Sequence, residues 1–231
     1  MAEYLKVKDY TYLEYCDYLQ NKYGIGLDDY MTKSYNAKAS CKRTKEGLIA
    51  HHKKEDTAIM LSTKEYAARH PFEWQQKENI VYCDYLEHLL LHILICKYPS
   101  AEKVDSVKVG YGGVVNFLVP ELNDLYSGWE PSQCWRKNCY DKVKNDKDVY
   151  LKLLKQFIDS ESNDPNFDVF ILYSSFNDPC TLLDKVYYEH SYGVSLLNRN
   201  SDVSSGTWNR SRNYSLFKEI EMLYKRPLGD C

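Results

Sequence analysis

The stretch "KENIVYCDYLEHLLLHILIC", residues 77–96, decides the fold, because it joins a strand-like run to a helix with defined ends. The run "NIVYC" is rich in β-branched and aromatic residues, which is typical of a strand. Asp84 is followed three residues later by Glu87, the spacing of a capping box, and Pro99 lies just beyond the apolar run. We therefore expect a strand followed by a helix over about residues 85–97.

Two histidines, His88 and His92, interrupt this otherwise apolar helix. Residues four apart on a helix lie on one face, so both imidazoles are expected to point the same way. An isolated pair would be interpreted as core or surface histidines. This pair is preceded by "GLIAHH", a short strand that ends in His51 and His52. Imidazoles bind Zn, Ni or Mn, and a histidine that binds no metal can take a proton from water, as phosphodiester hydrolysis requires.

The order His-His, then Asn79, then His-x-x-x-His resembles the ββα-metal or HNH nuclease motif. The run "ENIVYCDYLEHLLLH" is most similar to the colicin-type DNase form, in the Asn-to-His spacing and in the final histidine pair. The resemblance covers about residues 41–97. It implies an α+β fold in which a ββα-metal nuclease core is embedded in a mainly helical protein.

Carried over residue by residue, the resemblance implies that His51, His88 and His92 hold a divalent metal ion, with His88 and His92 alternatively holding the scissile phosphate. It implies that His52 is the general base and that Asn79 braces the loop carrying His52. Mg²⁺ or Mn²⁺ is expected first, with Zn²⁺ or Ni²⁺ as alternatives. The chain departs from the family in residues 53–77, a connection that is longer than usual and contains a predicted helix at "STKEYAARH", capped by Ser62. Glu55 and Asp56 follow the histidine pair but are assigned to a solvated loop.

The composition is that of an ordinary globular protein, with 231 residues, 44% hydrophobic residues and a net charge of −3. The first residues have no signal-peptide core, and no apolar run is long enough to cross a bilayer, so we expect a cytoplasmic protein without a membrane partner. The eight cysteines form no CxxC pair and are expected to be free thiols, with a structural zinc site as the alternative. A protein that binds nucleic acid through phosphates alone tends to be basic, which this chain is not.

Three segments are predicted: a helical segment over 1–40, the nuclease core over 41–98, and a mainly helical region over 99–231 for DNA recognition, dimerisation or both. Residues 4–22 are expected to form one amphipathic helix. Further helices are predicted at 116–126, 140–160, 178–190 and 213–226, and residues 168–175 form either a buried strand or a helical turn. His70 is expected to cap a helix end, and His190 to be structural.

Two basic runs are candidates for DNA contact. The run "CKRTKEG" offers Lys42, Arg43 and Lys45 to phosphates just before the first strand. The run "GTWNRSRNYS" contains the groove candidates Trp208, Asn209, Arg210, Arg212 and Asn213. A solvated basic loop is the competing interpretation of the second run.

The near-neutral charge and the large second half predict an enzyme that reads bases rather than one that degrades DNA blindly. We expect a metal-dependent, sequence-specific double-stranded DNA endonuclease of the type II restriction class, acting as a homodimer. A homing or phage-type nicking endonuclease is the alternative within the enzymes. A non-catalytic DNA-binding module with a structural metal is the alternative outside them.

Overall fold

The computed structural model describes residues 2–103, 108–167 and 169–176, and beyond them residues 216, 219, 220, 222 and 223. The chain divides into two compact units. The first comprises Met1–Val114 and Pro131–Val149, and the second comprises Val115–Glu130 and Tyr150–Cys231. Residues 1–40 and 41–98, predicted as separate segments, thus belong to the same unit.

The helix α4, Tyr85–Lys97, is the central element of the first unit. Its predicted bounds are confirmed, and so is its capping box: the Asp84 carboxylate accepts from the amides of Leu86 and Glu87, while Glu87 accepts from the Asp84 amide. Leucine and isoleucine side chains cover nearly all of its faces and are at most 2% exposed between Leu89 and Ile95, His92 excepted. A helix that is apolar all round has to be enclosed by other elements.

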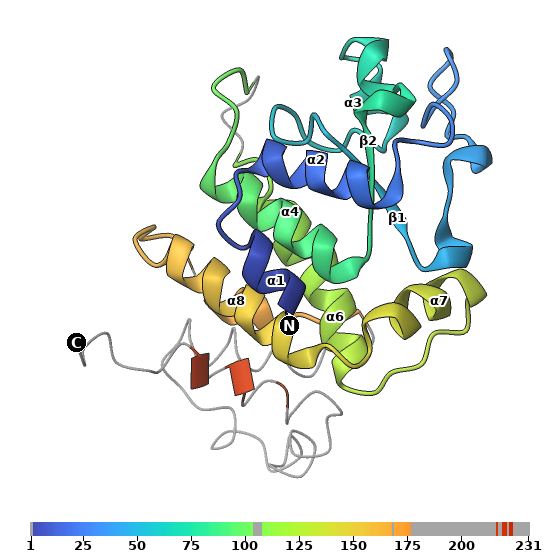
Figure 1. The fold of residues 1–231 in the computed structure, drawn as a ribbon. Helices are drawn as coiled ribbons and strands as arrows, with labels where there is room; N and C mark the ends of the chain where they lie inside the picture. The colour runs from blue at the N-terminus through green and yellow to red at the C-terminus, as the bar shows by residue number, and fades with distance from the viewer. Residues whose placement is uncertain are drawn as a thin grey trace, which may run out of the picture. The chain divides into compact units, whose positions relative to one another are not determined.

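A two-stranded antiparallel sheet lies beside this helix (Figure 1). Strand β1, Ile49–His52, pairs with β2, Ile80–Cys83, in the register that sets His51 opposite Val81 and His52 opposite Ile80. Every residue of β2 is buried, and this strand contacts both α4 and the helix α2, Tyr12–Tyr23. The order strand, strand, helix confirms the predicted α+β class.

The N-terminal segment differs from the expectation of one helix over residues 4–22. It forms α1, Ala2–Val7, and α2, separated by a turn in which Thr11 caps α2 and forms a complete capping box with Glu14. The single-helix prediction is wrong because the Thr-x-x-Glu pattern starts a new helix within the amphipathic run.

The connection between the two strands contains α3, Lys64–Ala67, and the 3-10 turns η3, Phe72–Gln75, and η4, Lys77–Asn79. The predicted helix is present but short, and its capping prediction is wrong: Thr63 is the N-cap and makes no side-chain cap bond. Before β1 lie two further 3-10 turns, η1, Ala39–Cys41, and η2, Thr44–Glu46. The helices α5, Tyr111–Gly113, and α7, Cys134–Val143, complete this unit, and both contact α4.

The second unit contains α6, Val119–Tyr126, preceded by a π-helical turn at Val114–Leu118, then α8, Lys147–Glu161, which begins in the first unit, and the 3-10 helix η6, Val169–Tyr173. Residues 140–160 are thus divided between α7 and α8, and of the stretch predicted as a strand or a helical turn, Val169–Tyr173 forms the helical turn η6. The fully buried Asn123 holds this unit together: its amide donates to the carbonyls of Leu172 and Ser174, and its oxygen accepts from Tyr150.

The predicted helix at 178–190 lies outside the described residues, and only Leu216, Glu219, Ile220, Met222 and Leu223 of the predicted helix at 213–226 are described, all as helical. None of the helices in the described ranges has both the length and the apolar character that crossing a membrane requires.

Candidate metal centre

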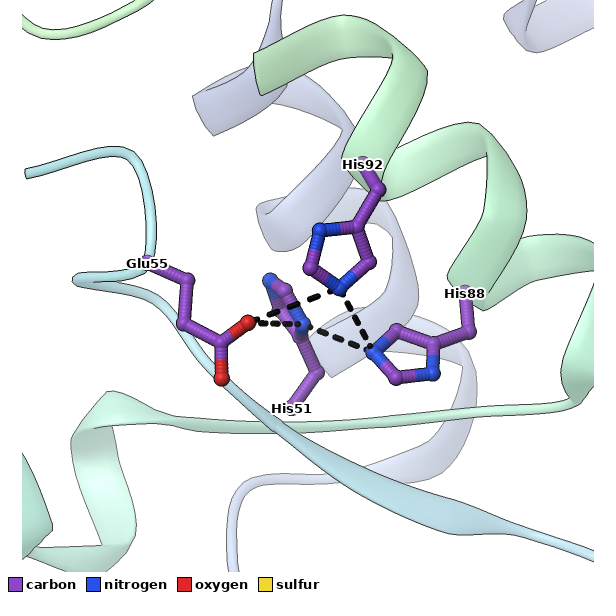
Figure 2. A group of neighbouring side chains, drawn as sticks. All are labelled: His51, Glu55, His88 and His92. Carbon is purple, nitrogen blue, oxygen red and sulfur yellow. Dashed lines mark hydrogen bonds and ion pairs between the residues drawn. The ribbon is translucent and has the colours of Figure 1, made fainter. Parts of the chain in front are cut away.

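Four side chains from three parts of the first unit converge beside β1 (Figure 2): His51 from the strand, Glu55 from the turn after it, and His88 and His92 from α4. His51 Nδ1 lies 3.0 Å from His88 Nε2, which lies 3.1 Å from His92 Nε2. The three histidines predicted as metal ligands are therefore brought together, although they come from segments far apart in the sequence.

Glu55 is the fourth member of the cluster, and sequence reasoning left it out. The turn after β1 folds back, with the Glu55 amide donating to the His52 carbonyl at 3.0 Å. One carboxylate oxygen, Oε2, then lies 3.5 Å from His51 Nδ1 and 3.4 Å from His92 Nε2. The sequence signal for this ligand was an acidic residue four positions after His51. It was not sufficient, because an irregular turn has no periodicity from which the direction of its side chains can be predicted.

Four of the six separations between the ligand atoms fit those expected around a single divalent ion. The four atoms all lie within 4.8 Å of one another. Ligands held about 2.0–2.1 Å from a tetrahedral zinc ion lie roughly 3.3 Å apart. The four separations of 3.0, 3.1, 3.4 and 3.5 Å are close to that value. Three imidazoles and one carboxylate are also a donor set that transition metals accept.

Burial keeps the imidazoles in the form that binds metal. It lowers the pKa of His51 to about 3, opposed by the charge of Glu55. It also lowers the pKa of His88, with help from the neighbouring His92 and His51, and the pKa of His92. Burial raises the pKa of the Glu55 carboxyl, but the positive charges that His51, His92 and His52 carry when protonated outweigh it, so the net shift is downward. Neutral imidazoles and an ionised carboxylate are the ligating forms of these groups.

Tyr12, the first residue of α2, contacts the cluster through its side-chain hydroxyl. Its buried hydroxyl donates to the His52 carbonyl at 3.2 Å and lies 2.9 Å from His51 Nε2. A hydroxyl has one proton, so a phenol that donates to the carbonyl accepts from His51, whose Nε2 then carries the hydrogen. This arrangement leaves the Nδ1 lone pair of His51 directed at His88 and Glu55. Sequence reasoning did not identify Tyr12.

His52 lies next to the cluster on the opposite face of β1, because successive strand residues point to opposite faces. Its Nε2 is 3.1 Å from the side-chain oxygen of Gln75, and its Nδ1 is 3.5 Å from Glu55 Oε1. The ring of Tyr30 packs edge-on against it, with centroids 4.5 Å apart. The predicted general base is thus not among the four clustered residues but touches Glu55.

Asn79 ties the ends of the connection between the strands together. Its carbonyl accepts from the Lys53 amide at 2.8 Å, and its side chain donates to the Glu73 carbonyl at 2.8 Å. Lys53 directly follows His52, so the backbone bond holds the chain on the C-terminal side of the predicted base.

The other predicted residues lie outside the cluster. Arg43 is held within the fold, where its guanidinium donates to the Tyr23 carbonyl and to Glu46 and stacks on Tyr82. Lys42 and Lys45 are exposed. The five groove candidates between Trp208 and Asn213 lie outside the described residues. His70, predicted as a helix cap, stacks on Trp74 with ring centroids 4.7 Å apart.

Six of the cysteines, Cys16, Cys41, Cys83, Cys96, Cys134 and Cys139, are in the described part of the chain and are free thiols, as predicted. Within the same part of the chain, the group formed by His51, Glu55, His88 and His92 is the one metal-binding candidate, and it contains no cysteine.

No family model, no curated protein and no solved structure matches this chain. A set of three imidazoles and a carboxylate, in which His51 and His92 are buried and Glu55 and His88 half-buried, can bind a metal ion, and the fourth imidazole beside it can accept a proton.

Proposed function

We propose that the protein is a metal-dependent phosphodiester hydrolase of the ββα-metal class. One observation carries this proposal: the strand, strand and helix that follow one another in the chain bring His51, His88 and His92 together, with His52 adjacent. The order of these residues is the order of the family motif. The antiparallel pair of β1 and β2, joined by the connection that contains α3, and the helix α4 support the assignment to this class.

Within this class, we propose a sequence-specific endonuclease of the type II restriction kind that cuts double-stranded DNA as a homodimer in the cytoplasm. Support comes from the sequence. Because the net charge is −3, electrostatic attraction to phosphates alone is a poor explanation of how the protein would bind DNA. The exposed Lys42 and Lys45, close in sequence to β1, are the described candidates for phosphate contact. The groove contacts are assigned to the predicted run from Trp208 to Asn213.

His51, Glu55, His88 and His92 would hold the metal ion. When bound, the ion polarises a phosphoryl oxygen and stabilises the charge that develops there. Its three imidazole ligands favour Zn²⁺ or Ni²⁺ over the Mg²⁺ that the resemblance to the nuclease motif implied, and Mn²⁺ lies between these preferences.

His52 would act as the general base. A water molecule attacks the phosphorus and gives its proton to His52, a new P–O bond forms, and one ester oxygen leaves and takes a proton from solvent. Asn79 would hold the backbone after His52 in place through Lys53. Tyr12 would keep the His51 ring oriented toward the ion.

A structural metal site in a non-catalytic DNA-binding module is the second candidate, and the burial of His51 and His92 favours it. His51 is 1% exposed and His92 is 6% exposed. A catalytic site needs an open position for substrate, whereas a structural site is closed by its protein ligands.

The test is incubation of the purified protein with plasmid DNA and Mg²⁺, Mn²⁺, Zn²⁺ or Ni²⁺, followed by sequencing of the product ends. His52→Ala should abolish cleavage while the metal content, measured by mass spectrometry, stays unchanged. His70→Ala is the matched control, because His70 lies outside the cluster. Double-strand ends that share a short sequence would support the restriction class, and single nicks the homing or nicking class. Absence of cleavage with every metal would support the structural site.

A further inference from the structure

Gln75 is a buried polar side chain to which the proposed mechanism gives no part. It closes the turn η3 in the connection between the two strands and is 1% exposed. Its amide makes two hydrogen bonds: Nε2 donates to the Leu61 carbonyl at 3.1 Å, and Oε1 lies 3.1 Å from His52 Nε2. A buried amide needs an acceptor for its NH₂ group and a donor for its oxygen, and Gln75 has one partner at each end.

The Leu61 carbonyl fixes which way the Gln75 amide faces. A carbonyl oxygen only accepts, so the NH₂ end of the amide has to face Leu61. The amide oxygen must then face His52, and this oxygen can also only accept. It follows that His52 Nε2 is the donor and carries a hydrogen.

The other nitrogen of His52 faces the candidate metal centre. In a neutral imidazole with hydrogen on Nε2, the lone pair is on Nδ1. His52 Nδ1 lies 3.5 Å from Glu55 Oε1, which is longer than a charge-assisted hydrogen bond. Glu55 is nevertheless the acceptor that would attract a hydrogen on Nδ1 if nothing held it on Nε2.

We infer that Gln75 is a positioning residue that fixes the tautomer of His52, keeping the hydrogen on Nε2 and the Nδ1 lone pair on the side of the metal centre. This inference deepens the proposed function and rests on it only for the use made of the lone pair. The wrong tautomer would turn an N–H toward Glu55 and leave no acceptor there for the proton of a water molecule. The Tyr30 ring packs against the His52 imidazole and limits its rotation, so that the two ring nitrogens keep their positions.

The tautomer is measured directly by long-range ¹H–¹⁵N correlation spectra of protein labelled in its histidine rings, as purified and after addition of diamagnetic Zn²⁺. His52→Ala identifies the resonances of this ring. We expect a protonated Nε2 and an unprotonated Nδ1 in the wild type. In Gln75→Leu the hydrogen should move to Nδ1 in a large fraction of molecules, because Glu55 becomes the remaining acceptor. Gln75→Glu should keep it on Nε2, because a carboxylate still accepts there.

Gln76→Leu is the matched control, since it makes the same chemical change one position along and leaves the His52 partner in place. A wild-type His52 with its hydrogen on Nδ1 would overturn the inference, and so would a Gln75→Leu protein with an unchanged tautomer. If Gln75→Leu fails to fold, the wild-type and Gln75→Glu spectra still decide the question.

Cleavage kinetics separate this inference from the proposed function. With an active enzyme, Gln75→Leu should lower kcat by about 100-fold or more while KM for DNA changes little, since only the proton transfer is impaired. A shifted tautomer with unchanged kcat would overturn the positioning role. A tautomer that responds as expected in a protein that cleaves no DNA would refute the proposed function and leave the assignment of the His52 hydrogen to Gln75 intact.

Discussion

The hydroxyl of Tyr12 lies outside the candidate metal centre and contacts one residue within it, His51. It accepts from His51 Nε2 and so leaves Nδ1 free to ligate. Removing such a support from a metal-ligating histidine typically costs 10- to 100-fold in metal affinity.

We therefore expect Tyr12→Phe to weaken Zn²⁺ binding by about 10- to 100-fold while the protein stays folded. Competition with a chromophoric chelator measures the affinity. Tyr15→Phe serves as control, because Tyr15 is a buried tyrosine of the same helix and is not a member of the cluster. Equal affinities in the two variants would mean that the His51 ring is held by packing alone.

Glu55 supplies the negative charge of the cluster. Glu55→Gln keeps the shape of the side chain but removes this charge, so we expect Zn²⁺ affinity to fall by more than about tenfold. Asp56→Asn is the matched control, since the Asp56 carboxylate accepts from Thr57 rather than facing the histidines. Isothermal titration calorimetry gives both affinities. If the Glu55→Gln protein binds Zn²⁺ as tightly as the control, Glu55 is not a ligand, and its assignment to a solvated loop was right.

Among the helices and strands, local sequence patterns were sufficient to predict some elements and not others. The helix α4 was predicted closely because a complete capping box starts it and a proline follows its end. The strand β2 was predicted from a run of β-branched and aromatic residues, and β1 from a short apolar run that follows a glycine turn. The division of residues 4–22 into α1 and α2 was missed, because an amphipathic pattern can continue across a break in the backbone.

The cap of α4 can be tested by Asp84→Ala. Loss of the carboxylate leaves the Leu86 and Glu87 amides without their partner. The free energy of unfolding should fall by about 1 kcal/mol, as measured by urea denaturation. Asp141→Ala, which removes an exposed carboxylate paired with Lys144, should cost less. A loss no larger than that of Asp141→Ala would show that packing alone fixes the start of α4.

The close approach of α5 to α4 positions His92. A Cβ atom on Gly113 would lie 2.3 Å from the His92 ring, so a side chain there has to displace the imidazole or the helix. We expect Gly113→Ala to reduce Zn²⁺ affinity to the level of His92→Ala, in the same chelator competition. Wild-type affinity in Gly113→Ala would show that α5 can shift without disturbing the ligand.

At the scale of the whole molecule, the candidate metal centre lies beside an apolar core whose burial stabilises the fold whether or not an ion is bound. The side chains of Leu19, Leu89 and Ile93 are fully buried, and the burial of each contributes about 1.5–3 kcal/mol to the stability of the fold. A bound ion adds stability by mass action, about 2.7 kcal/mol when its concentration is 100 times Kd.

Chelation should therefore lower the thermal unfolding midpoint without unfolding the protein at 25 °C. Circular dichroism reports the helices, and calorimetry the midpoint. His88→Ala should have the chelated midpoint with or without added Zn²⁺. Loss of helical signal on chelation at 25 °C would identify the ion as structural and favour the second candidate function.

The sequence by itself determined the local elements and the order in which the ligands occur. Capping patterns, β-branched runs and the four-residue histidine spacing act over a few neighbouring residues, so they could be recognised without the fold. Only the tertiary structure decided that Glu55 turns back to join His51 and His92, that Tyr12 holds His51, and that Gln75 faces His52. These contacts depend on how an irregular turn and a long connection pack against β1 and α4, and such packing is set by the whole surrounding core rather than by any local pattern.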